Sequence, residues 1–167
     1  MRYRVMVLAA VGLMILTSCS KQQSRIRSYD EAEVTRVVIF KGKRKMHLMN
    51  GDVALKSYTV GLGSAPIGHK QIEGDGRTPE GRYFIDRRNP ESRYHLSLGI
   101  SYPNKQDRAR ADLLGKNPGG DIFIHGEPRK GRPRRLDWTA GCISMRNEEI
   151  EQVYSMVRNG TPVEIYP

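Results

Sequence analysis

The stretch Ile124-His125-Gly126 and, after a basic loop, Trp138-Thr139-Ala140-Gly141-Cys142-Ile143-Ser144-Met145 organises the rest of the chain. Residues 121–124, Asp-Ile-Phe-Ile, are predicted to form a buried strand, and His125 follows directly after them. A strand that delivers a histidine, a return loop and a Gly-Cys turn can place an imidazole beside a thiol. We therefore predict that His125 and Cys142 meet in the folded protein.

A cysteine attacks carbonyl groups as the thiolate, so a catalytic cysteine needs a base or a positive environment. We predict that Cys142 is a nucleophile, that His125 is its base, and that the backbone N–H groups of Gly141 and Cys142 hold an oxyanion. The alternative stays open at this point, because a free cysteine is usually a small buried apolar residue.

The quoted residues resemble the catalytic stretch of L,D-transpeptidases of the YkuD type, and in particular the subgroup with D-W-T-x-G-C. Three further stretches resemble the same subgroup in the same order, so that the resemblance covers about residues 34–167. These stretches are Gly68-His69-Lys70, Gly74-Asp75-Gly76-Arg77-Thr78-Pro79-Glu80-Gly81 and Ile100-Ser101-Tyr102-Pro103-Asn104.

The resemblance implies acyl transfer on peptidoglycan stem peptides through a Cys142 acyl-enzyme. It implies attack at a diaminopimelate carbonyl, with D-alanine or a wall-linked lipoprotein as the leaving group. The acceptor would be a second diaminopimelate, a lipoprotein lysine or water, and the last makes the protein a hydrolase. Substrate contacts are expected from Trp138, Thr139, Arg146 and His69.

Two positions depart from the larger family, which often has His before the Gly-Cys pair and Arg two residues after the cysteine. This chain has Ala140 and Ser144 at those places, and Arg146 is displaced by two positions. The departures put recognition of a substrate carboxylate by that arginine in doubt.

The first 18 residues are expected to be a lipoprotein signal peptide. A short positive region precedes an apolar run over residues 5–16, which is too short for a spanning helix. The run ends in Leu16-Thr17-Ser18-Cys19, which resembles a lipobox and predicts lipidation at Cys19. Ser20 then favours the outer membrane, facing the periplasm. An ordinary secretory signal or an uncleaved anchor are the alternatives.

Residues 19–33 are polar and are expected to form a flexible tether from the lipid to a catalytic domain over residues 34–167. If Cys19 is acylated, it cannot form a disulfide with Cys142, which leaves an unpaired thiol in an exported protein.

The formal net charge of +10 permits nucleic-acid binding. The expected export and the scarcity of aromatic residues argue against it and favour stem-peptide carboxylates or anionic lipid head groups. Membrane contact is expected through the lipid anchor only. No cluster of His, Cys and acidic residues has metal-ligand spacing, so we predict no metal site and no cofactor.

Patterning predicts a mainly β fold, a sandwich-like pair of small mixed sheets with two helices. Asn50-Gly51 predicts a two-residue hairpin turn, and Asn104 and Asn147 are predicted helix N-caps. Strands are expected over 35–40, 45–49, 53–60, 82–86, 94–102, 121–124 and 161–166, and helices over 104–114 and 148–158. Asp75 is expected to cap a turn in a long glycine-rich connection.

The return loop over residues 127–138 is either a solvated charge run or a lid that faces the substrate, with Lys130, Arg132, Arg134 and Arg135 as its cations. Other classes remain as alternatives. A sortase-type enzyme would have a different cysteine motif, and a papain-like peptidase would have the cysteine before the histidine. The non-enzyme alternative is a tethered wall-binding lipoprotein.

Overall fold

The computed structural model describes residues 29, 32–128, 131 and 135–167 of the 167-residue chain. The elements in chain order are β1 (Arg36–Phe40), β2 (Lys45–Asn50), β3 (Val53–Thr59), β4 (Gly81–Asn89), β5 (Ser97–Ile100), α1 (Lys105–Leu113), β6 (Phe123–His125), β7 (Ile143–Ser144), α2 (Asn147–Met156) and β8 (Pro162–Tyr166). The predicted signal peptide, Cys19 and most of the predicted tether lie outside the described residues, as do Lys130, Arg132 and Arg134.

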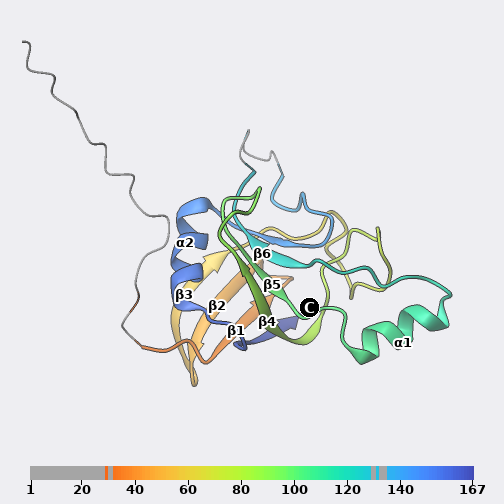
Figure 1. The fold of residues 1–167 in the computed structure, drawn as a ribbon, viewed down its shortest axis with the longest axis horizontal. Coiled ribbons are helices and arrows are strands. Elements are labelled where there is room, and N and C mark those ends of the chain that lie inside the picture. Colours follow the sequence, from red (N-terminus) through yellow and green to blue (C-terminus); the bar gives the residue numbers. More distant parts are fainter. Residues whose placement is uncertain (1–28, 30–31, 129–130, 132–134) are drawn as a thin grey trace, which may run out of the picture.

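The strands form one curled, mixed sheet in the order β3-β2-β1-β8-β4-β5-β6-β7. The long strand β4 pairs with β8 on one side and with β5 on the other, so it joins the two small sheets that patterning predicts. The pairs β1–β8 and β6–β7 are parallel, and the other pairs are antiparallel. Figure 1 shows α2 packed beside β1–β3, while α1 lies at the opposite end of the molecule.

A two-residue hairpin turn joins β2 and β3 as predicted, but it lies one position later than Asn50-Gly51: Asn50 is the last residue of β2, and Gly51 and Asp52 form the turn. Asn50 pairs with Val53, and Gly51 has a φ of 53°, which a glycine adopts without a steric penalty. The apolar side chains of β1 and β2 that alternate into the core, such as Val37, Ile39 and Leu48, are fully buried. Patterning thus predicts both the turn and the buried face of this part of the sheet.

Helix α2 closes the core with one apolar face of Ile150, Val153 and Tyr154, as its periodicity predicts. Its start corrects the prediction that Asn147 is the N-cap. Arg146 is the N-cap, and Asn147 Oδ1 instead accepts a hydrogen bond from Glu127 N–H at 2.9 Å. The side chain is therefore used to fasten the segment after His125. The helix also ends earlier than predicted, at Met156, because Val157 is extended.

Helix α1 begins at the cap that the sequence predicts. Asn104 Oδ1 accepts hydrogen bonds from the N–H groups of Gln106 and Asp107, and the Asp107 carboxylate accepts the Asn104 N–H in return. Asp107 is itself 2% exposed and also accepts from the Tyr83 hydroxyl, which ties α1 to β4. Within the described ranges, no helix has the length and apolar character needed to cross a membrane.

The glycine-rich connection over residues 61–80 runs against the segment that carries Cys142. Gly61 bridges to Ser144 and Gly63 bridges to Thr139. Asp75 holds the connection in shape, as predicted, by accepting hydrogen bonds from three backbone N–H groups and from Lys70 Nζ. Lys41, 2% exposed at the end of β1, donates to the carbonyls of residues 68 and 78 and pairs with Glu80 at 2.7 Å. These contacts fix the connection against residues 139–144 at its start and against the end of β1 at its later part.

Candidate active site

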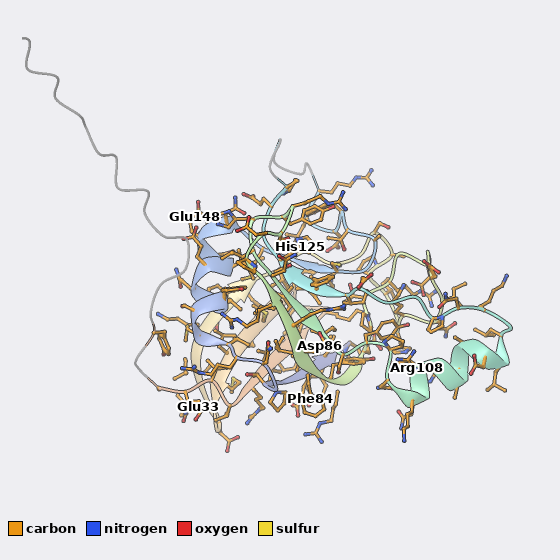
Figure 2. The ribbon with its side chains drawn as sticks, in the orientation of Figure 1. Glu33, Phe84, Asp86, Arg108, His125 and Glu148 are labelled. Atoms are coloured by element: carbon orange, nitrogen blue, oxygen red, sulfur yellow. The ribbon has the colours of Figure 1, made fainter. Side chains whose placement is uncertain are left out.

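The pairing of β6 with β7 sets Cys142 and His125 on one face of the sheet. Ile124 pairs with Ile143 and His125 pairs with Ser144, so Cys142 lies beside Phe123. Side chains two residues apart on a strand point to the same face, which puts His125 on the Cys142 side and about 7 Å further along. Figure 2 shows His125 at the end of β6, below the loops at the top of the view.

The Cys142 sulfur is half-buried and is held by backbone groups of the neighbouring strand. Phe123 N–H donates to Sγ at 3.4 Å, and the thiol donates to the carbonyl of Asp121 at 3.5 Å. The thiol and the imidazole make no direct hydrogen bond to one another in this structure, although both residues are described. The two candidate residues thus share a face of the sheet, and proton transfer between them would need the thiol to rotate away from Asp121.

His125 is 3% exposed, and its tautomer follows from its hydrogen bond. Nδ1 lies 2.7 Å from the carbonyl oxygen of Gly126, and a carbonyl can only accept, so Nδ1 carries the proton. The neutral ring therefore has its lone pair on Nε2. The Tyr94 ring lies 4.6 Å from the imidazole by ring centroids, and the Trp138 ring meets it edge-on at 5.6 Å. This arrangement keeps the imidazole fixed and ready to accept a proton.

Burial shapes the ionisation of both groups. It lowers the pKa of His125, and the hydrogen bond to Gly126 offsets only part of that effect. It also raises the pKa of the Cys142 thiol, with the Phe123 N–H and the charge of Lys70 acting in the opposite direction and the Asp121 carboxylate adding to the rise. Both groups are therefore neutral before substrate binds: Cys142 is a thiol and His125 an uncharged imidazole. A strongly activated cysteine would instead form a thiolate–imidazolium pair.

The turn before Cys142 is held by Thr139, which is 6% exposed. Thr139 Oγ1 donates to the Cys142 carbonyl at 2.7 Å and accepts the Gly141 N–H at 3.1 Å. Gly141 has a φ of 141°, and a Cβ there would lie 2.7 Å from the Arg77 carbonyl oxygen, so only glycine fits. The Gly141 N–H, which was predicted to bind an oxyanion, therefore already donates to Thr139 Oγ1. The Cys142 N–H makes no hydrogen bond to any described residue.

The two charges that act on the Cys142 thiol can be removed one at a time. We expect Asp121→Asn to lower the pKa of Cys142 and Lys70→Met to raise it, because the first removes a carboxylate and the second a cation. The rate of alkylation by iodoacetamide, measured from pH 6 to 11, reports the thiolate fraction. Its midpoint in the unchanged protein should lie above that of a free thiol. Equal midpoints in the two variants would contradict the electrostatic account.

Asp137 is a residue that sequence reasoning did not assign a role. Its carboxylate accepts two hydrogen bonds from Arg44 Nε and Nη2, at 3.0 and 2.7 Å, and one from the Leu62 N–H at 2.9 Å. It therefore anchors the segment that carries Trp138 to both β1–β2 and the glycine-rich connection. Tyr94 and Lys70 were also missed. Tyr94 lies in an irregular segment with no motif around it, and Lys70 acts on Cys142 only through the folded connection.

Two predicted substrate contacts point elsewhere. His69 Nδ1 accepts the Glu80 N–H at 3.0 Å, and Nε2 pairs with Asp107 on α1 at 3.1 Å. It lines a separate pocket of about 520 Å³ beside Arg82, Arg110 and the C-terminal residues. Arg146 is exposed at the start of α2 and pairs with Glu149 at 3.4 Å. Trp138 and Thr139 do lie at the Cys142–His125 face. Among the described residues no three His, Cys, Asp or Glu side chains gather as metal ligands.

The comparisons with known proteins agree with this geometry. Residues 34–165 match the family described as YkuD, the L,D-transpeptidase catalytic domain. The Escherichia coli K12 protein provisionally named L,D-transpeptidase YafK is 33% identical over 122 residues, which are 68% of this chain and 44% of that protein.

Solved structures also share the fold. The helical cell shape determining protein Pgp2 of Campylobacter jejuni is 29% identical, with a TM-score of 0.65 over 82% of this chain and 49% of that one. Bd1075 of Bdellovibrio bacteriovorus is 26% identical, with a TM-score of 0.57 over 80% and 48%. This chain thus spans less than half the length of these relatives. With a family match over most of its length and the same mainly β fold, the chain belongs to the L,D-transpeptidase catalytic-domain family.

Proposed function

We propose that this protein is a cysteine-dependent acyltransferase that acts on peptidoglycan stem peptides. The observation that carries the proposal is the fixed tautomer of His125. Its Nδ1–H is committed to the Gly126 carbonyl, so its free lone pair is on Nε2, in the plane of the ring, and His125 lies on the same face of the sheet as Cys142. A buried apolar cysteine with a purely structural role would need no such neighbour.

The reaction follows from these groups. Nε2 of His125 takes the thiol proton as Sγ of Cys142 attacks the stem-peptide carbonyl, so that the barrier to thiolate formation is lowered during attack. The free N–H of Cys142 is placed to donate to the developing oxyanion, and Gly141 N–H could join only by leaving Thr139. The tetrahedral intermediate collapses to a thioester, and the leaving amine takes the proton from His125. An acceptor amine or water then attacks, and Cys142 regains its proton.

The acyl donor in this proposal is the diaminopimelate carbonyl, with D-alanine or a wall-linked lipoprotein as the leaving group. Transfer to an amine gives cross-linking, and transfer to water gives trimming or lipoprotein release. The cell-shape role in the name of the Campylobacter relative supports a role in wall remodelling. The proposal includes a periplasmic location, with a lipid on Cys19 and a tether to the outer membrane.

The test is muropeptide analysis of purified sacculi incubated with the full chain. The proposal expects new cross-links, shortened stems or released lipoprotein, which separate transfer, trimming and detachment. The same incubation with Cys142→Ala is the control and should leave the sacculi unchanged. If both proteins leave the muropeptides unchanged while the full chain still sediments with sacculi, the wall-binding lipoprotein is the better description.

A further inference from the structure

Paired residues on β4, β5 and β6 put one arginine, Arg87, on the same face of the sheet as Cys142. Arg87 on β4 pairs with Gly99 on β5, and Gly99 pairs with Phe123 on β6. Phe123 in turn lies beside Cys142, with its N–H 3.4 Å from Sγ. Directly paired residues of neighbouring strands project to the same face of a sheet. Arg87 therefore shares its face with Cys142 and His125.

The Arg87 side chain extends across Gly99 towards the Phe123 ring, and two features of the sheet permit this. The β4–β5 register shifts between Ile85 and Arg87, and such a bulge redirects the side chain that follows. Gly99 leaves the space that the side chain fills. A Cβ at position 99 would lie 2.5 Å from Arg87 Cγ and 2.6 Å from its Nε. The guanidinium carbon reaches 4.8 Å from the centre of the Phe123 ring, next to the cysteine.

Two acidic residues orient the guanidinium and leave part of it available. Arg87 Nε lies 3.3 Å from Asp86 Oδ1, and Nη1 lies 3.3 Å from Asp121 Oδ1. Figure 2 shows Asp86 on β4, beside the strands that carry these paired residues. The Asp121 side chain is 80% exposed, so its pair with Arg87 is a weak surface pair that a better-placed anion can displace. The backbone carbonyl of Asp121 accepts the hydrogen bond that the Cys142 thiol donates.

The other cations near the site are committed elsewhere. Lys70 is 3% exposed and bound to Asp75 and the carbonyl of Ile72. Arg146 is paired with Glu149 at the start of α2. Position 144, where the larger family often has an arginine, holds a buried serine. Arg87, in contrast, lies on the face of the sheet that carries Cys142, and its side chain is half-exposed.

We propose that Arg87 binds a carboxylate of the acyl donor close to the carbonyl that Cys142 attacks, and so selects acidic peptides. The inference rests on the proposed function, because it deepens the substrate class of the same site. A guanidinium can donate two parallel hydrogen bonds to a carboxylate. When the substrate carboxylate binds, it would displace the Asp121 carboxylate from the Arg87 guanidinium. In this assignment Arg87 does the work that an arginine two residues after the cysteine would otherwise do.

The test compares alkylation of Cys142 by anionic iodoacetate and neutral iodoacetamide. Because Arg87→Gln also leaves Asp121 unpaired, the variants are made in an Asp121→Asn background. We expect Arg87→Gln in that background to lower the iodoacetate-to-iodoacetamide rate ratio about three- to tenfold relative to Asp121→Asn alone. Arg87→Lys should recover part of the ratio. The matched control is Arg82→Gln, which removes an 81%-exposed arginine from the same strand.

The outcomes separate this inference from the proposed function. A ratio that does not change in Arg87→Gln, or that changes equally in Arg82→Gln, overturns the role of Arg87 while Cys142 remains reactive. Cys142 that reacts with neither reagent overturns the proposed function as well. A misfolded variant is recognised by its iodoacetamide rate, which a specific loss of carboxylate binding leaves unchanged. With an acyl-donor peptide, the same substitution should raise KM for the free acid but not for its amide.

Discussion

Replacing Cys142 with alanine should abolish the covalent adduct that this protein forms with a carbapenem. The β-lactam carbonyl accepts Sγ, the ring C–N bond breaks, and the nitrogen takes the proton, so the protein gains the whole mass of the reagent. Alanine removes the only atom that can form this bond at the site. Intact-protein mass spectrometry after incubation of the full chain measures the result. We expect one adduct on the unchanged protein and none on Cys142→Ala.

Cys142→Ser is the informative companion variant. It keeps the shape of the side chain and a donor to the Asp121 carbonyl, but a hydroxyl is a much weaker nucleophile than a thiol. We expect a circular dichroism spectrum and melting temperature like those of the unchanged protein, with an adduct that forms far more slowly or not at all. An adduct that persists in Cys142→Ala would show that another residue is acylated and would end the assignment of the nucleophile.

The second large effect is expected from His125→Asn. Asparagine keeps a donor near the position of Nδ1, where it can still reach the Gly126 carbonyl, but it has no group at Nε2. General base catalysis by a placed histidine is worth about 10²–10⁴-fold, and we expect the rate of carbapenem acylation at pH 7 to fall by that order. Stopped-flow fluorescence or quenched mass spectrometry follows the rate.

The pH profile separates a lost base from a lost fold. At a pH above the raised pKa of the Cys142 thiol, the thiolate forms without a base, so the acylation rate of His125→Asn should approach that of the unchanged protein. A structural defect would instead lower the rate at every pH. His47→Gln serves as the matched control, because His47 lies on β2, bound to the Ser57 hydroxyl, away from the Cys142 face. A flat deficit across pH, or an equal deficit in the control, would argue against His125 as the base.

Local sequence signals predicted the elements that depend on neighbouring residues. The Asn104 cap and the apolar face of α2 rely on residues within a few positions, and both are confirmed. The β2–β3 hairpin is confirmed too, with its two-residue turn one position later than predicted, at Gly51-Asp52. Asn147 shows where this reasoning fails. It is a good N-cap residue in a good N-cap position, yet its side chain binds the chain after His125 because that partner arrives from a distant strand.

The candidate site was predictable in its motifs and not in its environment. The motif predicts that Cys142 and His125 meet, and strand register puts them on one face of the sheet without a direct hydrogen bond. Tyr94 against the imidazole and Phe123 beside the thiol depend on the folded sheet. Lys41 is a further example. Local sequence predicts that a lysine in a charged segment is exposed to solvent. Lys41 is buried instead, because two backbone carbonyls and Glu80 bind its ammonium group. These contacts join residues 19 to 39 positions apart and leave no local pattern.

The place of β8 has a consequence for how the sheet holds together. Residues 162–166 lie in the middle of the sheet, between β1 and β4. A chain without these residues has β1 and β4 with open edges and no strand to join them. Sheet closure depends on pairs such as Val37 with Val163, and contacts between such distant parts of the chain form slowly. Loss of β8 would therefore divide the sheet into two parts, β1–β3 and β4–β7.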